Sequence, residues 1–371
     1  MPKKNPDANH GKQPNQKLKP YLVLQYLLKN SDENHTVRTP DIVAFLQDEC
    51  GIYAERRSIY RDIEEINKAM LILEDGYTAA EAEEMLENDE ADRYVVYDKS
   101  KKGFYVQQRH YEYEDIRLLA EAIYSAKFLT EKQTQNLVDV VCEFVSEHQA
   151  ETIKHDAFLT DRVRTINKSV INNLSTINSA MSKELEGQKH IPEKISFKYL
   201  KYSISDLNKQ VERRGGVKYT VSPYALLIND GYYYLLAFND ERQDMRTYRV
   251  DRMKDVRPIG EERTGAEAFA AMDLKTYTQR VFGMFGGQQE RVQIRFINSL
   301  LDAVVDRFGT KGILYSKVDE THFRVSAPVE VSDQFFSWIC QFGRRAKIVG
   351  PDSVVEQFRE YLDKIRSIYE G

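Results

Sequence analysis

The sequence has few cysteines and no long apolar run. None of its 371 residues belongs to a stretch that approaches the roughly 18 apolar residues of a membrane helix, so we expect no membrane span. The three cysteines, Cys50, Cys142 and Cys340, lie far apart and form no CxxC pair. This spacing argues against a zinc site and a disulfide framework, and it favours a reducing compartment. The N-terminal residues have no apolar core and predict no secretory signal, so we expect a cytoplasmic protein.

Catalytic motifs are missing as well. The sequence contains no GxSxG, no HExxH, no Walker loop and no dinucleotide fingerprint. Its 7 histidines are scattered without the spacing of metal ligands. We therefore predict no catalytic residues, no metal site and no cofactor, and we expect a binding protein rather than an enzyme.

An overall excess of positive charge is also absent. The formal net charge is −5, so the chain as a whole is not a basic polymer binder, and any nucleic-acid surface must be local. One segment does carry such an excess. Residues 195–260 contain 12 Lys/Arg and 8 Asp/Glu, a net charge of +4. This local excess favours an anionic ligand such as a nucleotide or a short single strand.

The length of the chain suggests two or three domains. Residues 1–16 have almost nothing to bury and predict a disordered tail. Three helices are expected after it, the second with Thr39 as its N-cap and Pro40 at its first helical position.

The third helix is the clearest of the three. Its apolar residues Ile59, Ile63 and Ile66 follow a helical period and fall on one narrow stripe, so we expect them to be buried. Basic and hydroxyl residues crowd its first two turns: Arg56, Arg57, Ser58, Tyr60 and Arg61. A short second helix, a turn with Gly51 and this third helix together indicate a helix-turn-helix. The alternative is a solvated face, because residues 1–69 hold 11 Lys/Arg and 10 Asp/Glu.

A hairpin with a basic tip completes the predicted DNA-binding domain, residues 17–110. Residues 94–98 and 104–108 are two short β-rich runs, and the turn between them contains Lys101 and Lys102. After a helix-turn-helix this pattern predicts a wing whose lysines contact backbone phosphates. The acidic insert at residues 71–93 is not expected to face DNA, because the phosphates would repel it.

Two further segments flank the centre of the chain. Residues 111–187 repeat apolar residues at helical spacing and predict a helical connector that is a natural dimer element. Residues 261–371 alternate predicted strands and helices, which indicates an α+β domain. Strands are expected at 292–296, 323–329 and 346–349, and helices at 264–272, 300–308, 332–342 and 352–368.

The centre of the chain is the stretch from 222 to 253, which reads as three short strands. The turn Asn229-Asp230-Gly231 is a strong hairpin signal, because these residues tolerate positive φ. On the third strand, arginines occur among apolar residues, and tyrosines crowd the second. Arginine beside tyrosine suits an anionic ligand with flat rings. The alternative is a small β-barrel with surface arginines.

This stretch resembles the core of the WYL domain. Tyr233-Tyr234-Leu235 stands where that family has Trp-Tyr-Leu, and a Pro-Tyr-x-Leu run and an Arg-Thr-aromatic-Arg-x-Asp-Arg run, Arg246 to Arg252, flank it. The run Arg-Arg-Ser-Ile-Tyr-Arg-Asp-Ile-Glu from Arg56 similarly resembles the recognition helix of regulators that carry a WYL domain. Tyr233 in place of Trp is a departure that keeps the π-face and adds a hydroxyl.

The resemblance implies a multidomain α+β protein. We expect a winged helix-turn-helix, a helical connector, a small Sm-like β-barrel at 188–260 and a C-terminal extension domain. The implied function is a homodimeric transcriptional regulator that binds a palindromic operator in double-stranded DNA and senses a nucleotide or short single-stranded nucleic acid. An alternative is an RNA- or single-strand-binding accessory protein of a defence system that regulates no promoter.

Candidate ligand-binding residues follow from the resemblance and from charge: Tyr199, Tyr233, Arg246, Arg249 and Arg252. Strand alternation places Arg246 and Arg252 on one face and Arg249 on the other unless a bulge intervenes. The three arginines therefore cannot line one flat site on a regular strand. We favour Arg249 and Tyr233 by resemblance, and Arg246 or Arg252 by charge alone.

Overall fold

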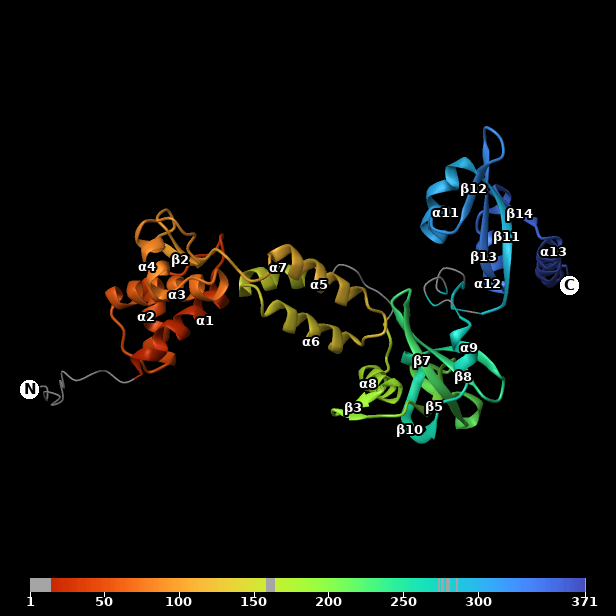
Figure 1. Cartoon of the computed structure of the whole chain (residues 1–371), viewed down its shortest axis with the longest axis horizontal. Helices are drawn as coiled ribbons and strands as arrows, with labels where there is room; N and C mark the ends of the chain where they lie inside the picture. Colours follow the sequence, from red (N-terminus) through yellow and green to blue (C-terminus); the bar gives the residue numbers. More distant parts are fainter. Residues whose placement is uncertain are drawn as a thin grey trace, which may run out of the picture. The chain divides into compact units, whose positions relative to one another are not determined.

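The chain is described by a computed structural model at residues 15–157, 164–272, 274, 277, 281–284 and 286–370. Contacts divide it into two units, Met1–Ala126 with Glu131–Val163 and Lys127–Thr130 with Arg164–Gly371. Both helices and sheets occur along the chain (Figure 1). The predicted tail at 1–16 lies outside the described residues except for its last two. No helix in the described part is long and apolar enough to cross a bilayer.

The first unit begins with helices around a shared core. The elements are η1 (Gln16–Leu18), α1 (Lys19–Asn30), α2 (Thr39–Ala44), the π-helix η2 (Phe45–Glu49), α3 (Arg56–Glu74) and α4 (Ala79–Glu87). The stripe Ile59, Ile63 and Ile66 of α3 is buried against Leu27 of α1 and Ile42 of α2, as predicted. Burial of this stripe turns the opposite side of α3 outward.

A two-stranded hairpin, β1 (Val95–Asp98) and β2 (Gly103–Val106), belongs to the same core. Phe104 and Val37 exchange two backbone hydrogen bonds of 2.8 Å, so the segment between α1 and α2 pairs with β2. The buried Asn67 amide of α3 donates to the Val95 carbonyl (3.1 Å) and accepts from its N–H (2.7 Å). The hairpin is therefore fixed to α3 and to the α1–α2 segment.

The start of α2 differs by one residue from the sequence prediction. Arg38 occupies the cap position, and Thr39 and Pro40 are the first two helical residues. The backbone N–H of Arg38 donates to the Asp41 carboxylate at 3.2 Å. Because the carboxylate at the third helical position binds this N–H, the helix starts without a hydroxyl cap.

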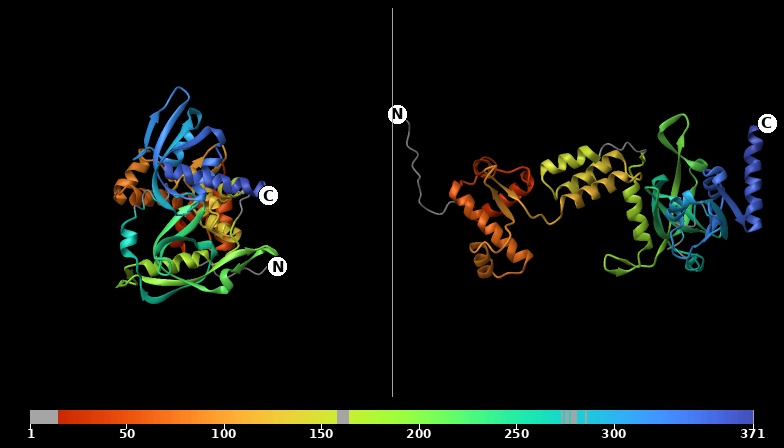
Figure 2. Two further views of the ribbon diagram at one scale, coloured as in Figure 1. Left: turned by 90° about the vertical axis from the view of Figure 1, so that its right-hand side faces the viewer. Right: turned by 90° about the horizontal axis from the view of Figure 1, so that it is seen from above.

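Three helices follow in the first unit: α5 (Tyr113–Ser125), α6 (Glu131–Cys142) and α7 (Glu147–Ala157). They lie side by side in Figure 1 and in the right-hand view of Figure 2, and they share a small core that includes Ile116, Val138 and Ile153. The last predicted connector helix, α8 (Val170–Met181), lies in the second unit and packs into the core of the central sheet.

The central sheet has six main strands, β5 (Glu193–Ser203), β6 (Asp206–Glu212), β7 (Lys218–Asn229), β8 (Tyr232–Asn239), β9 (Asp244–Arg249) and β10 (Met253–Glu262). A short hairpin of β3 (Glu184–Leu185) and β4 (Gln188–Lys189) precedes it, η3 (Arg213–Gly216) follows β6, and η4 (Val250–Arg252) joins β9 to β10. Asp230 and Gly231 have φ values of 48° and 75°, which confirms the tight hairpin predicted between β7 and β8.

This sheet does not close on itself among the described strands, so the expected small Sm-like β-barrel is not confirmed. Its order is β10-β5-β7-β8-β9 with β6 beside β5, and among the described strands β9 and β10 do not pair with each other. The 3-10 turn η4 takes three residues out of strand conformation, and β10 then pairs with β5 at the other edge. Within the described part, the sheet therefore has two free edges, at β9 and at the side of β10 and β6.

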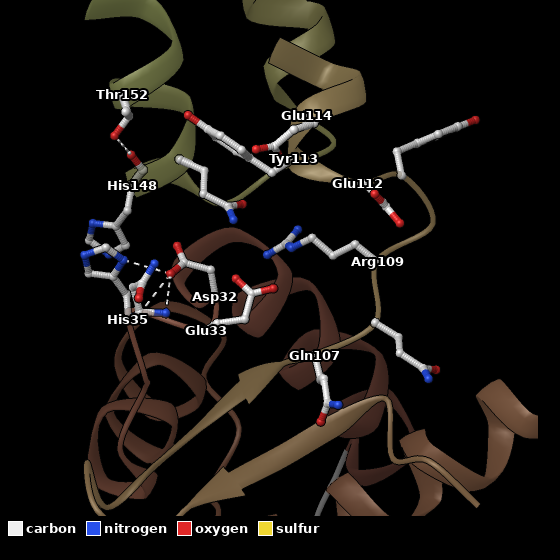
Figure 3. A pocket seen from close by; sticks show the side chains of 14 residues that line it. Asp32, Glu33, His35, Gln107, Arg109, Glu112, Tyr113, Glu114, His148 and Thr152 are labelled. Atoms are coloured by element: carbon white, nitrogen blue, oxygen red, sulfur yellow. Dashed lines mark hydrogen bonds and ion pairs between the residues drawn. The ribbon is translucent and has the colours of Figure 1, made fainter. Parts of the chain in front are cut away.

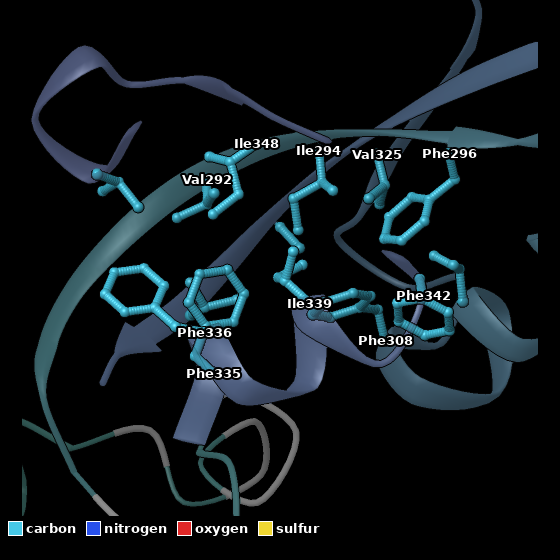
Figure 4. Close-up of a cluster of buried hydrophobic side chains, with 14 of the residues drawn as sticks. Val292, Ile294, Phe296, Phe308, Val325, Phe335, Phe336, Ile339, Phe342 and Ile348 are labelled. Carbon is cyan, nitrogen blue, oxygen red and sulfur yellow. The ribbon is translucent and has the colours of Figure 1, made fainter. Parts of the chain in front are cut away.

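The C-terminal part contains α9 (Ala266–Ala270), β11 (Gln288–Ile297), η5 (Asn298–Leu300), α11 (Leu301–Phe308), β12 (Leu314–Lys317), β13 (His322–Val331), α12 (Asp333–Cys340), η6 (Gly343–Arg345), β14 (Ala346–Gly350) and α13 (Asp352–Tyr369). Four strands form an antiparallel sheet in the order β12-β13-β11-β14. Apolar side chains on one face of it meet the helices in a dense core (Figure 4). The predicted strands and helices are confirmed here, and β12 was not predicted.

Candidate functional site

The first two turns of α3 expose three arginines, Arg56, Arg57 and Arg61. Arg57 and Arg61 are four residues apart, so they lie on the same face, opposite the buried isoleucine stripe. Both are exposed, and within the described part of the chain neither makes a hydrogen bond or an ion pair. Arg56 instead bonds the Tyr60 hydroxyl, and this contact lowers the pKa of Tyr60.

Two other candidates on α3 face inward. The Ser58 hydroxyl donates to the Glu55 carbonyl (2.8 Å) and accepts from the Lys19 ammonium (3.0 Å). The half-buried Tyr60 ring packs edge-on against Phe104 of the hairpin, with the ring centres 5.2 Å apart. Ser58 therefore joins α3 to α1, and Tyr60 joins α3 to β2. These two residues hold α3 in place and do not belong to the exposed face that carries Arg57 and Arg61.

The hairpin tip separates its two candidate lysines. Lys101 donates from its ammonium to the carbonyls of Glu33 (2.7 Å) and Asn34 (3.3 Å), so it holds the α1–α2 loop. Lys102 is exposed at a φ of 57°, and no contact of its side chain is recorded within the described part. Asp98 fixes this turn: hydrogen bonds from Ser100 and Lys101 lower the pKa of its carboxyl.

The acidic insert covers the other end of the exposed side of α3. Lys68 pairs with Glu83 of α4 at 2.8 Å, and Arg93 holds both Glu64 oxygens at 2.7 Å. Leu71 is buried with apolar residues of α4. Because Glu64 and Lys68 lie on the same face as Arg57 and Arg61, α4 leaves only the first two turns of that face open.

A pocket in the first unit lies beside the loop after α1, the segment after β2, and the starts of α5 and α7 (Figure 3). The rings of His35 and His148, which sequence spacing did not connect, stack with centres 3.9 Å apart. The buried Asp32 carboxylate accepts from His35 Nδ1 (2.9 Å) and the Ser146 hydroxyl (2.5 Å).

Arg109 lies across the same pocket. One of its nitrogens donates to the carbonyls of Leu28 (2.7 Å) and Ser31 (2.6 Å), and burial lowers the pKa of its guanidinium. These contacts tie the end of α1 to the segment before α5. Among the described residues no group of three His, Cys, Asp or Glu side chains is arranged to hold a metal ion.

In the central sheet, the register of β8 and β9 separates the two residues favoured for the ligand site. Arg249 pairs with Tyr234, and Leu235 pairs with Tyr248. Because paired residues share a face and neighbours alternate, Arg249 lies on the face of Tyr232 and Tyr234. Tyr233 points the other way, into the core beside Phe128, with ring centres 4.6 Å apart. Tyr233 and Arg249 therefore lie on opposite faces of the sheet, and their joint role at one ligand site stays a prediction.

Arg249 has a fixed environment built from its own turn. Its guanidinium makes two hydrogen bonds to the buried Asp251 carboxylate, at 3.0 and 2.8 Å, and lies 3.5 Å from the Tyr232 ring centre. Burial acts to lower the pKa of Arg249, but Asp251 and Tyr232 outweigh it and the net shift is upward. The backbone N–H of Arg249 donates to the Tyr199 hydroxyl at 3.1 Å.

The other predicted residues occupy three different places. Arg246 is exposed and pairs with Asp244 two residues away, at 2.9 Å. Tyr199 is largely buried, and burial raises the pKa of its hydroxyl. Arg252 lies in η4, so strand alternation does not apply to it, and its charge acts on both Tyr199 and Tyr234. Arg252 is half-buried, and no partner for its side chain is recorded within the described part.

The structure therefore brings Arg249 together with the Tyr232 ring and the buried Asp251 carboxylate, on the sheet face of Tyr234, and the charge of Arg252 acts on Tyr234. Sequence reasoning missed Tyr232 and Asp251. The signal for Tyr232 was present, because the Asn229-Asp230-Gly231 turn fixes the register of β8. Guanidinium groups beside phenol rings can bind an anion that carries a flat ring.

Comparison with known proteins agrees with this description of the second unit. Residues 193–258 match the WYL domain family, and residues 288–366 match the WCX domain family. The chain carries a WYL domain followed by a WCX domain. The WYL match spans β5 to β10, and the WCX match spans β11 to α13.

Matches to two solved structures cover the whole chain, at TM-scores below 0.5. Proteasome accessory factor B/C (PafBC) of Arthrobacter aurescens is 14% identical, with a TM-score of 0.27, and the match covers 100% of this chain and 52% of that chain. A CRISPR Cas-related protein is 13% identical, with a TM-score of 0.34, and the match covers 100% of this chain and 97% of that one. This chain thus spans about half the length of the PafBC chain.

Proposed function

We propose that the protein is a sequence-specific, DNA-binding transcriptional regulator whose WYL domain senses an anionic ligand. WYL domains commonly occur in regulators that bind DNA and sense ligands. The observation that carries the proposal is the pair Arg57 and Arg61, which stand exposed on the first two turns of α3 and make no hydrogen bond or ion pair with any described residue. A helix presented in this way, beside a hairpin with an exposed lysine, supports the proposal of a winged helix-turn-helix.

The remaining contacts of α3 support this use of the helix. Its apolar stripe is buried, Tyr60 and Asn67 fasten it to the hairpin, and α4 covers its later turns. The open turns fit a major groove, where arginine reads guanine through two hydrogen bonds. Lys102 at the hairpin tip is placed to hold a phosphate. These turns read few base pairs, so we propose a homodimer on a palindromic operator.

The test is operator affinity for the Arg57→Ala/Arg61→Ala variant. If each arginine reads a base, each substitution costs about 1–3 kcal/mol, and the double variant binds at least about tenfold more weakly. The matched control removes two exposed arginines from α13, Arg359→Ala/Arg366→Ala, and should bind as wild type. Equal affinity of the double variant and wild type would reject α3 as the reading helix. Duplex sites are first found by footprinting DNA from the gene's own neighbourhood.

For the sensor, the proposed ligand is a nucleotide or a short single strand bound at Arg249 and Arg252. Calorimetry on wild type and Arg252→Gln tests this site without disturbing the fold, because Arg252 makes no recorded contact within the described part. Arg249→Ala is less clean, since it leaves the Asp251 carboxylate buried and unpaired. A ligand regulates DNA binding only if it favours one conformation of the protein over another. A ligand that leaves operator affinity unchanged would remove the sensor role.

A further inference from the structure

The open face of the WCX sheet carries three cations in a single row. In the register of the sheet, Arg295 of β11 stands directly opposite Arg324 of β13 on one side and Lys347 of β14 on the other. The alternate residues of β11, Val292, Ile294 and Phe296, are fully buried on the helix side. Because neighbours along a strand point to opposite faces, the three cations share the face that the helices do not cover.

This row is not neutralised from within the chain. Arg324 and Lys347 are exposed and Arg295 is half-buried, and in the described part of the chain no carboxylate forms an ion pair with any of them. The one contact recorded is a long bond of 3.4 Å from Arg324 to the Gln293 side chain. Like charges at directly opposed positions destabilise a sheet. The arrangement is therefore unfavourable unless an anion lies along the row.

The spacing and chemistry of the row point to a chain of phosphates. Three adjacent strands set the cations about 10 Å from end to end, which is too long for one phosphate group. Hydroxyl and amide groups on the same face, from Ser316, Ser326 and Gln293, add neutral donors. Guanidinium groups, hydroxyls and amides are the usual contacts of nucleic-acid backbones.

The same face indicates how the nucleic acid is held. The rings of Phe296, Phe323 and Tyr315 all belong to the core side of the sheet, so they offer no platform for stacking bases. Recognition would then rest on backbone charge and not on base sequence. A flexible single strand can align its phosphates with a row that crosses three strands.

We propose that the open face of the WCX sheet binds the backbone of a single-stranded nucleic acid through Arg295, Arg324 and Lys347. This surface is separate from the residues around Arg249 and from the arginines of α3, so it stands or falls independently of the proposed function. It gives the C-terminal domain a binding role of its own.

The test uses the full chain and a labelled oligothymidine of about 16 nucleotides, the upper end of the site size for one small fold. Anisotropy measures affinity at several salt concentrations. Each phosphate contact contributes about 0.7 to the log–log slope against salt, so Arg295→Gln/Arg324→Gln/Lys347→Gln should lower the slope by about 2. Contacts made elsewhere on the chain cancel in this difference.

A matched control removes three exposed cations of the same domain away from the row, Lys311→Gln/Arg359→Gln/Arg366→Gln, and should keep the wild-type slope. Operator affinity is measured in parallel and should stay unchanged in both triple variants. A salt slope of single-strand binding that falls by about 2, with intact duplex binding, supports the proposal. The proposal would be overturned if the salt slope of the row variant equalled that of wild type, or if the control variant lost as much slope. This outcome does not depend on whether α3 binds DNA.

Thermal melting supplies a second readout. Relief of repulsion should raise the melting temperature of Arg295→Gln in low salt, and the gain should vanish in high salt, where the charges are screened. If Arg295→Gln instead melted at a lower temperature than wild type in low salt, the three cations would not repel one another. The premise that the row needs an anion would then fail.

Discussion

The guanidinium of Arg249 lies 3.5 Å from the centre of the Tyr232 ring. The same guanidinium is held by Asp251 two residues later, so the turn that ends β9 supplies its own counter-ion. An anion at this site would approach an arginine whose position is already fixed by a carboxylate and a ring. That preorganisation lowers the entropy lost on binding, although the anion must share the cation with Asp251.

Removal of the Asp251 charge should destabilise the second unit strongly. The Asp251 side chain is 3% exposed, and breaking a buried ion pair by removing one partner typically costs about 3–5 kcal/mol. Asp251→Asn is therefore expected to unfold at a much lower urea concentration than wild type. The matched control is Asp244→Asn, which breaks the exposed pair with Arg246 and should cost at most about 1 kcal/mol. Similar losses for both variants would contradict the structural role of Asp251.

Asp32→Asn should weaken the joint between α1 and α7 in a pH-dependent way. Burial acts to raise the pKa of the Asp32 carboxyl, but hydrogen bonds from Ser146, His35 and Asn34 outweigh burial and lower it. A carboxyl with a lowered folded-state pKa stabilises the protein above its ordinary value of 3.8 and loses that contribution as pH falls through the folded value.

The stability difference between wild type and Asp32→Asn should therefore be about 1–3 kcal/mol at neutral pH and shrink below pH 3.8. Chemical denaturation across this range measures it. Asp139→Asn, at the exposed pair with Lys154, is the control and should change stability by less than about 1 kcal/mol at any pH. A difference that grows on acidification would refute the assignment.

Tyr60 should act on DNA binding through packing. Its ring contacts Phe104 and Tyr97. Loss of a fully buried aromatic ring lowers the free energy of unfolding by about 3–5 kcal/mol, and because Tyr60 is half-buried we expect Tyr60→Ala to lose less than this. Tyr60→Phe keeps the ring and removes the hydroxyl that bonds Arg56 and Thr39. It should retain operator affinity within a few-fold. A large loss of affinity in Tyr60→Phe, without loss of stability, would instead place the hydroxyl on the DNA.

Gly103 should not tolerate a side chain. A Cβ atom there would lie 2.6 Å from the Thr36 hydroxyl oxygen and 3.0 Å from the Val37 carbonyl, at the point where β2 meets the α1–α2 segment. Gly103→Ala is expected to cost about 1–3 kcal/mol and to loosen the hairpin. Gly286→Ala, where nothing lies within 4 Å of the added carbon, should be nearly neutral. Melting curves of the two variants measure this difference, and equal melting temperatures would contradict the prediction.

Local patterns allowed much of the fold to be predicted. The isoleucine stripe of α3 and the Asn229-Asp230-Gly231 turn each involve a few neighbouring residues, and their chemistry leaves little choice of conformation. The strand β12 was missed because it has only four residues and its place depends on pairing with β13. Such long-range pairing has no signature within the short segment itself.

The ligand site was predicted only in part, for a related reason. Strand parity correctly separated Arg249 from Arg246, but the resemblance then grouped Arg249 with Tyr233 instead of Tyr232. For Arg252 the argument from strand alternation failed, because η4 interrupts the strand and no sequence feature predicted the 3-10 turn. On α3, the inward contacts of Ser58 and Tyr60 depend on α1 and β2, which are distant in sequence.

The helix α8 has a consequence for how the WYL domain can be inherited or engineered. Its buried residues Val170 and Ile177 fill the same core as Ile195 and Phe197 of β5. A fragment or gene fusion cut to the matched residues 193–258 would contain the sheet without α8. The apolar side chains of the sheet that α8 covers would then be exposed to water. The unit that can be moved between proteins begins upstream of Val170, well before the point where similarity to the family begins.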